Sequence, residues 1–262
     1  MGRRGGGRRH VSNLLLLLIA LTLLGATTRI PTTRILPAAT GRVTSPATAL
    51  HLLQRGRAAR ASGDLPRARI LLTQAIRVAP TWGIAYLELG FTAHLAQPGC
   101  LAAIAALDKA AELAPNNARV HYYRGIVLQH AGHTANAAQA FTRALALRHD
   151  LIDAWYRLAT CERQAGHADE TVRALQKVLE HDRHHLGALL ALAQLHEDRG
   201  ELDAAESALL RIVQDQPHVA YHRYRLAQFY ARIGESSKAQ AAFRRADDLD
   251  PRPPERKMRD LR

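Results

Sequence analysis

The sequence contains few of the residues that build β-sheets. Aromatic side chains make up only 5% of the 262 residues, whereas alanine and leucine are abundant. Strands depend on aromatic and β-branched residues, while Ala, Leu, Arg, Glu and Gln favour helices. The composition therefore predicts an all-α protein.

Cysteine is also scarce, which limits the redox and metal chemistry of the chain. The two cysteines, Cys100 and Cys161, belong to no CxxC or CxxCH motif. At the level of motifs this excludes zinc ribbons, thioredoxin-like redox sites and attachment of c-type haem. We expect two unpaired thiols that pack as small apolar side chains.

The body of the chain has little net charge, although the formal net charge of the whole chain is +13. The first 48 residues contain seven arginines and no acidic residue, and residues 251–262 carry a net charge of +3. Residues 49–250 are left with +3. A nucleic-acid interface requires clustered basic residues on the folded body, so we expect no nucleic-acid partner. The basic ends are interpreted as topology and tail signals.

Residues 1–28 have the layout of a bacterial-type secretory signal. A basic start is followed by an apolar stretch over residues 14–24 and by the small residues Gly25 and Ala26. As a helix, the uncharged residues 11–28 would be about 27 Å long, close to the thickness of ~30 Å of a bilayer's hydrocarbon core. An uncleaved signal anchor and cleavage after Ala26 both stay open.

The arginines before the apolar stretch predict that the N-terminus stays in the cytoplasm and that the body is exported. The protein would be anchored in the inner membrane facing the periplasm, or free in the periplasm if the signal is cleaved. Residues 29–48 are rich in Thr and Pro and are expected to form a linker, and residues 252–262 form a basic C-terminal tail.

Glycines recur at a fixed interval in the body. Gly132, Gly166, Gly200 and Gly234 lie 34 residues apart, and Gly63 fits the same frame if one inserted residue near residues 97–99 is allowed. Glycine adopts positive φ at little cost, so we expect each of the five to form a structural turn that ends a helix.

Small and large side chains keep the same frame. Small residues stand seven positions before each turn, at Gly56, Gly90, Gly125, Ala159, Ala193 and Ala227. Large apolar residues stand nine positions after it, at Leu72, Leu107, Phe141, Leu175, Leu209 and Phe243. The small residues allow two helices to approach closely, and the large ones fill the space between them.

Each unit is thus expected to be a helix–turn–helix that cannot bury its own apolar face and must stack on its neighbours. Prolines, which stop a second helix, close four of the six units, at Pro80, Pro115, Pro217 and Pro251. The predicted repeat domain spans residues 49–251, with units at about 49–82, 83–117, 118–151, 152–185, 186–219 and 220–251.

These columns resemble the tetratricopeptide repeat (TPR) family, whose 34-residue pattern opens with W-x2-L-G-x2-Y. Trp155, Leu158 and Ala159 match that opening in the fourth unit, as do Tyr86, Leu89 and Gly90 in the second and Leu226, Ala227 and Tyr230 in the sixth. The chain departs from the pattern at His149 and Arg183, which replace the closing proline of the third and fourth units.

The resemblance implies an α-solenoid of about six units that forms a right-handed superhelix. The first helix of each unit would line a concave groove that binds a peptide or a partner helix. The family's groove positions fall here on Arg57, Arg60, Phe91, His94, Arg119, Tyr122, His130, Tyr156, Arg163, Gln194, Glu197, Tyr221, Tyr224, Gln228 and Arg232.

This predicted groove is basic and aromatic, with an acidic island at Glu197 and Asp198. Aromatic and Arg side chains supply much of the binding energy at interfaces. We expect an unidentified protein or peptide ligand that carries acidic and apolar residues. The alternative is an ordinary solvated surface with scattered tyrosines. Leu53 and Arg57 occupy the Lys and Asn positions of chaperone-adaptor members, which argues against that role.

The sequence has no motif that indicates catalysis. It lacks HExxH, a Gly-rich phosphate loop and a Gly-x-Ser-x-Gly elbow. Among the 14 histidines, His181, His184 and His185 stand close together, but a structural metal site needs four converging ligands with supporting contacts. We expect no enzymatic activity, no cofactor and no metal.

Three functional hypotheses follow from these patterns. The first is a protein–protein interaction scaffold of the cell envelope. The second is a regulatory or substrate-presenting subunit of an enzyme complex, which would also use the groove. The third is a metal- or haem-handling protein that uses the histidines.

Overall fold

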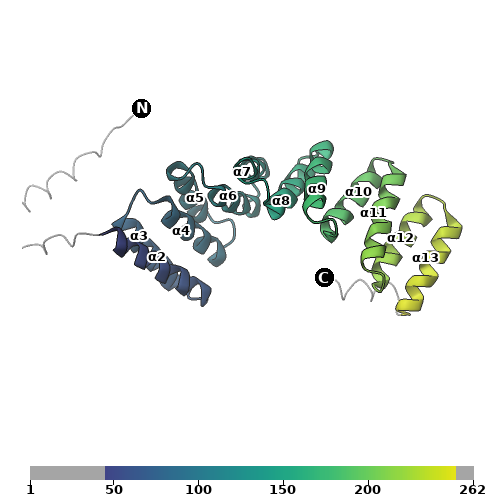
Figure 1. Ribbon diagram of the computed structural model, residues 1–262, viewed down its shortest axis with the longest axis horizontal. Coiled ribbons are helices and arrows are strands. Elements are labelled where there is room, and N and C mark those ends of the chain that lie inside the picture. Colours follow the sequence, from purple (N-terminus) through teal and green to yellow (C-terminus); the bar gives the residue numbers. More distant parts are fainter. Residues whose placement is uncertain (1–44, 252–262) are drawn as a thin grey trace, which may run out of the picture. The chain divides into compact units, whose positions relative to one another are not determined.

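The computed structural model describes residues 45–251, and this part of the chain is entirely helical (Figure 1). It contains twelve α-helices and no strand. They form six pairs: α2 (Pro46–Ala61) with α3 (Leu65–Val78), α4 (Gly83–Ala96) with α5 (Leu101–Leu113), α6 (Ala118–His130) with α7 (Thr134–Leu147), α8 (Ile152–Gln164) with α9 (Ala168–His181), α10 (Leu186–Asp198) with α11 (Leu202–Asp215), and α12 (Ala220–Arg232) with α13 (Ser236–Leu249).

The helices pack in the order in which the chain makes them. The two helices of each pair contact one another, and the second helix of a pair contacts the first helix of the next. Figure 1 shows the pairs following one another from α2–α3 to α12–α13. The fold is an all-α repeat solenoid, as the sequence predicted.

The turns within five of the six hairpins are built around a glycine with positive φ. Gly63, Gly132, Gly166, Gly200 and Gly234 have φ between 72° and 83°. At Gly132 the backbone N–H donates to the carbonyl of Gln129 at 3.1 Å, and the next N–H, that of His133, donates to Leu128 at 2.9 Å. These bonds satisfy the last carbonyls of the first helix and define a Schellman cap. An added Cβ at Gly132 would meet no atom within 4 Å, so backbone conformation alone requires glycine there.

The second hairpin closes differently because its turn is one residue longer. Gly99 has φ 69°, and its N–H donates to Nδ1 of His94 at 3.2 Å. A Cβ at this position would lie 2.8 Å from backbone atoms of His130 and Ala131. The frame of the repeat predicted only an inserted residue here. In the structure this residue lets the turn of the second hairpin pack against the end of α6.

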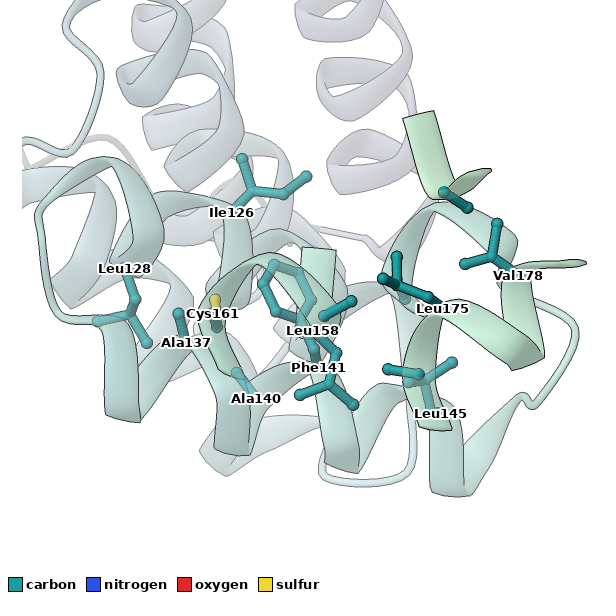
Figure 2. Close-up of a cluster of buried hydrophobic side chains, with 14 of the residues drawn as sticks. Ile126, Leu128, Ala137, Ala140, Phe141, Leu145, Leu158, Cys161, Leu175 and Val178 are labelled. Atoms are coloured by element: carbon teal, nitrogen blue, oxygen red, sulfur yellow. The ribbon is translucent and has the colours of Figure 1, made fainter. Parts of the chain in front are cut away.

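The hydrophobic core is shared between neighbouring hairpins. Phe141 of α7, Leu158 of α8 and Leu175 of α9 belong to one buried cluster with Ile126 of α6 (Figure 2). Leu192 of α10 belongs to the same cluster. Each hairpin therefore completes the core of the next, which is the physical reason for the repeat.

Small residues on the first helices allow this packing. A Cβ at Gly125 would lie 2.6 Å from the ring of Phe141, and one at Gly90 would lie 2.7 Å from Leu107. Such distances are far below van der Waals contact, so the large side chain of the second helix occupies the volume that a Cβ would need.

Three first helices are tied to the preceding loop by the same side-chain bond. A ring or guanidinium N–H at the fourth position of the unit donates to the backbone carbonyl six residues earlier: Trp155 to His149 at 2.9 Å, His121 to Pro115 at 2.8 Å and Arg223 to Pro217 at 3.2 Å. Each of these side chains places an N–H at the same carbonyl, which explains why residues as different as Trp, His and Arg can occupy one position of the repeat.

One predicted boundary is wrong. Residues 46–48 were expected to belong to the linker, but α2 begins at Pro46. The side chain of Ser45 accepts the N–H of Thr48 at 3.3 Å, and proline fits the first helical position because its nitrogen needs no acceptor there. The predicted signal segment (residues 1–28) and the predicted basic tail (residues 252–262) lie outside the described residues.

None of the helices between residues 45 and 251 is long and apolar enough to span a membrane.

Candidate binding face on the first helices

The predicted groove residues all lie on the first helices of the six pairs, and the surface that these helices form is called here the first-helix face. Consecutive first helices touch at the N-terminal end of the described chain, where α2 contacts α4 and α4 contacts α6. Side chains from different hairpins therefore meet on this face.

An arginine cluster occupies its N-terminal part. The carboxylate of Glu88 on α4 is only 1% exposed. Arg57 bonds to its Oε1, with Nη2 at 2.6 Å and Nε at 2.8 Å, and Arg60 bonds to its Oε2 at 2.5 Å. Arg119 on α6 lies 3.8 Å from Oε1. Arg57, Arg60 and Arg119 around Glu88 are called the arginine cluster below.

The cluster is structurally necessary as well as basic. A carboxylate without water pays a large desolvation cost unless its oxygens are paired and hydrogen-bonded. The bonds from the two arginines of α2 meet that need and join the first hairpin to the second. Sequence reasoning placed Arg57, Arg60 and Arg119 on this face but missed Glu88. The available signal was that Glu88 is the single acidic residue of α2, α4 and α6.

Aromatic rings contact two arginines of this cluster, Arg60 and Arg119. The guanidinium of Arg60 lies 4.8 Å from the ring centre of Phe91, and that of Arg119 lies 5.9 Å from the ring of Tyr123. The two rings are 4.5 Å apart. Tyr123 was not predicted as a groove residue, yet it completes this group of rings.

His94 is not available as a ligand-facing side chain, so this prediction is wrong. It is 6% exposed, and its ring stacks on that of His130 with 4.9 Å between the centres. Its Nδ1 accepts the N–H of Gly99, and its Nε2 lies 3.1 Å from Nδ1 of His130. Burial, with the nearby His130 and Arg157, lowers the pKa of His94 below its ordinary 6.5. His94 serves the turn of the second hairpin, and His130 is exposed beside it.

Tyr122 is engaged in a contact between the third and fourth hairpins. Its hydroxyl donates to Oδ2 of Asp153 on α8, which also accepts a bond of 2.6 Å from Arg157. Burial, strengthened by the bond to the carboxylate, raises the pKa of Tyr122 to about 12. The phenol is therefore neutral at physiological pH and stabilises the stack of hairpins.

An open pocket of about 340 Å³ lies between α8 and α10. Three predicted residues line it: Tyr156 and Arg163 from α8 and Gln194 from α10. Its wall also includes Thr160, Leu175 of α9 and Asp198. This α8–α10 pocket is the place where the structure brings predicted residues of different hairpins together around an empty volume.

The shape of the pocket depends on a glycine. A Cβ at Gly187 would lie 2.8 Å from the hydroxyl of Tyr156, so a larger residue there would require the phenol to shift from its position across the start of α10. The Tyr156 ring also contacts the ring of His185, with 4.9 Å between centres. The side chain of Arg163 is exposed at the other end and takes part in no hydrogen bond or ion pair among the described residues.

The C-terminal part of the face is largely self-paired. Arg232 forms an ion pair with Oε2 of Glu197, whose Oε1 is buried and has no hydrogen-bond partner among the described residues. Tyr224 packs edge-on against Phe243 of α13, with 5.4 Å between ring centres. Tyr221 and Gln228 are partly exposed. The predicted acidic island is thus partly neutralised by Arg232.

Two of the three clustered histidines, His184 and His185, have local structural roles. Nδ1 of His185 accepts the N–H of Ala188 at the start of α10, and His184 pairs with Asp215 at 2.8 Å. Within residues 45–251, no group of three or more His, Cys, Asp or Glu side chains is arranged to hold a metal ion.

A larger pocket of about 590 Å³ lies away from the predicted residues, between α7 and the end of α8. Its lining is mostly small and polar and includes the buried Cys161. Burial raises the pKa of this thiol to about 11, so it is protonated at neutral pH. Both Cys100 and Cys161 are free, and Cys161 packs as a small apolar side chain, as expected.

Comparisons with known proteins support the repeat. Three family models, each described as a tetratricopeptide repeat, match residues 91–152, 162–223 and 223–253. Together they cover more than half of the chain. Among curated proteins none matches significantly.

Solved structures share the fold at low sequence identity. MamA is 22% identical, with a TM-score of 0.61 over 66% of this chain and 94% of that chain. YrrB, described as a TPR protein with an unusual peptide-binding site, is 24% identical, with a TM-score of 0.60 over 69% and 92%. PilW, described as a type IV pilus biogenesis factor, is 15% identical, with a TM-score of 0.61 over 83% and 99%.

Proposed function

The chain belongs to the tetratricopeptide repeat family, and from this premise we propose that it is a protein–protein interaction scaffold that binds a peptide segment or a partner helix on its first-helix face. The observation that carries the proposal is the α8–α10 pocket. It combines Tyr156, Arg163 and Gln194 from two hairpins around a volume of about 340 Å³.

The pocket has the chemistry of an anchor site for one side chain. Ala159, Leu175 and Ala191 provide an apolar floor, while the arginine and the glutamine stand at its rim. A buried apolar or aromatic side chain in such a pocket, with hydrogen bonds at the edge, is the usual centre of a protein interface. The partner segment would insert one large apolar side chain between α8 and α10.

Selection from a random peptide library displayed on phage tests the proposal. We expect peptides with a recurring apolar or aromatic position, and Tyr156→Ala should weaken their binding at least about tenfold. Arg143→Ala is the matched control, because Arg143 is exposed on α7 away from the first-helix face. If no peptide is selected, or if Tyr156→Ala and Arg143→Ala bind the selected peptides equally, the pocket is not the binding site.

We also propose that the scaffold acts in the cell envelope after export. The support is the pattern of residues 1–28, with its basic start and apolar stretch. Mass determination of the protein purified from its native cells tests this, together with separation of membrane and soluble fractions. A full-length membrane-bound chain indicates an anchor, and a chain that begins after Ala26 indicates a periplasmic protein. A full-length chain in the cytoplasm contradicts export.

The partners recovered with the protein distinguish the scaffold from the second hypothesis. Envelope assembly proteins that crosslink to the first-helix face would support a scaffold. A single enzyme recovered in fixed stoichiometry would indicate a regulatory or substrate-presenting subunit instead.

A further inference from the structure

The charges on the first-helix face are unevenly distributed. The helices α2, α4 and α6 contain five arginines and one acidic residue, Glu88. The charge of Arg124 is neutralised by an ion pair with Asp108 of α5, in which Nε and Oδ1 are 2.6 Å apart. In contrast, α10 contains Glu197 and Asp198 and no Lys or Arg. The N-terminal part of the face therefore carries excess positive charge, whereas α10 carries none and its Glu197 is paired with Arg232.

The carboxylate of Glu88 neutralises only part of the positive charge of the arginine cluster. Both oxygens of Glu88 already accept short bonds, Oε1 from Arg57 and Oε2 from Arg60. Arg119 is 3.8 Å from Oε1, beyond hydrogen-bond distance. Three guanidinium groups thus face one carboxylate, and the cluster has an excess of two positive charges.

The uncompensated donors reach the surface. The side chain of Arg119 is 51% exposed and that of Arg57 is 39% exposed, whereas the side chain of Glu88 is 2% exposed. An incoming group would therefore meet N–H donors from α2 and from α6 and would not meet the carboxylate. The N–H donors of a guanidinium form a fork that matches the two oxygens of a carboxylate.

The arginines are held in place before any ligand arrives. The contacts of Arg60 with Phe91 and of Arg119 with Tyr123 restrict the guanidinium planes. The bonds to Glu88 restrict Arg57 and Arg60 further. Side chains that are already ordered lose less conformational entropy on binding, which favours affinity.

We propose that the arginine cluster binds acidic side chains of the partner segment, so that an acidic stretch lies over α2, α4 and α6 while the apolar anchor enters the α8–α10 pocket. This inference rests on the proposed function. The excess cations stand on two different helices, so more than one carboxylate is required. Neighbouring Asp or Glu side chains supply several carboxylates, whereas a chain terminus supplies one. On the fifth hairpin, α10 offers no Lys or Arg to the same stretch.

Fluorescence anisotropy with two labelled synthetic peptides tests the inference. One peptide alternates glutamate with leucine and tyrosine and has an amidated C-terminus, and the other has glutamine at every glutamate position. We expect the full chain to bind the acidic peptide at least about tenfold more tightly, with an advantage that shrinks as salt is added. Equal affinities would overturn the proposal.

Arg119→Glu locates the site. Arg119 is the suitable position because its replacement leaves Glu88 bonded to Arg57 and Arg60, and retained affinity for the glutamine peptide shows that the variant is folded. We expect the variant to lose about tenfold in affinity for the acidic peptide, with little change for the glutamine peptide. Arg143→Glu on α7 changes the net charge equally and should leave both affinities unchanged. The proposal fails if the two variants behave alike.

Two further results separate this inference from the proposed function. If Tyr156→Ala weakens both peptides and Arg119→Glu weakens neither, the face binds peptides but the arginine cluster is not an acidic subsite. A version of the acidic peptide with a free C-terminal carboxylate should bind like the amidated one. Binding of the free-acid version alone would show recognition of a chain terminus and would overturn the inference.

Discussion

At the scale of single residues, glycine has two separate roles in this solenoid. Gly132 is required by its φ of 80°, with open space around it, whereas Gly125 is required because the ring of Phe141 fills the volume of a Cβ. Both are glycines of the same repeat, but substitution of each one tests a different physical effect.

Gly125→Ala should destabilise the protein by about 1–3 kcal/mol, because the added methyl overpacks the core against Phe141. Combination with Phe141→Leu should recover part of the loss, since the fourth and fifth units have alanine and leucine at the corresponding positions, Ala159 with Leu175 in one buried cluster and Ala193 with Leu209 in another. Urea unfolding measures both variants. A double variant no more stable than Gly125→Ala would show that the contact with Phe141 is not the cause.

Gly132→Ala should cost about 1–2 kcal/mol, because an L-residue is strained in the left-handed region. Phe141→Leu should not rescue this variant, since no side chain lies within 4 Å of the missing Cβ. Gly132→Asn should lose less stability than Gly132→Ala, because asparagine tolerates the left-handed conformation better. Equal losses in the alanine and asparagine variants would contradict the role of φ.

Acid should weaken the second hairpin through His94. Its Nδ1 accepts the N–H of Gly99, so its proton is on Nε2 and is directed at Nδ1 of His130. The folded pKa is lowered by burial, by His130 and by Arg157. The unfolded chain therefore takes up a proton first as the pH falls through about 6.5, and stability is lost below that value.

His94→Gln should reduce this acid sensitivity, because the amide oxygen can still accept from Gly99 but does not titrate. Melting temperatures at pH 7.5 and at pH 5.5 measure the effect. His222, whose pKa is also lowered by burial, should maintain part of the acid sensitivity in the variant. An unchanged pH dependence in His94→Gln would exclude His94 as a source.

At the scale of helices, the second helices of the hairpins differ in whether a side chain caps their first N–H groups. Asp64 accepts the N–H of Arg67 at 3.0 Å at the start of α3. His133 and His167 hold the same position before α7 and α9, where no side chain forms this bond. The repeat frame specifies where a helix begins, and the individual residue determines how well its first N–H groups are satisfied.

His133→Asp should therefore stabilise the protein by about 1 kcal/mol, because aspartate adds a cap and a negative charge at a helix N-terminus. Asp64→Ala should lose a similar amount. Thermal unfolding at neutral pH measures both variants. A destabilised His133→Asp variant would show that the histidine makes a contribution that aspartate cannot replace.

At the scale of the whole molecule, stability should be distributed along the chain, because contacts join neighbouring hairpins. A chain truncated after Val219, which removes α12 and α13, should keep its helical circular dichroism per residue and melt at a lower temperature. A chain truncated after Ile233 removes only α13 and uncovers the apolar side of α12, so it should be less stable than the shorter chain. An unfolded chain after truncation at Val219 would contradict a linear core.

The agreement between sequence and structure follows the range of the interactions. Gly132 and its equivalents, Phe141 and the small residues opposite it act within one hairpin or between adjacent ones, and a 34-residue period encodes such contacts. The inserted residue near residues 97–99 was predicted, but the role of Gly99 was not, because its reason is the backbone of His130 in the next hairpin. Family models match residues 91–152, 162–223 and 223–253, and α2 and α3 form the same kind of hairpin outside those matches.

The sequence by itself determined the all-α class, the pairing of helices and the placement of the predicted groove residues on the first helices. Only the tertiary structure decided which of those residues are free. Arg57 and Arg60 hold the buried Glu88, His94 serves a turn and Glu197 pairs with Arg232, whereas Tyr156, Arg163 and Arg119 still present donors or rings to a partner. The reason is physical: a repeat specifies which face a side chain occupies, but partners such as Glu88 for Arg57, His130 for His94 and Arg232 for Glu197 belong to other hairpins. These contacts form only when the hairpins have stacked.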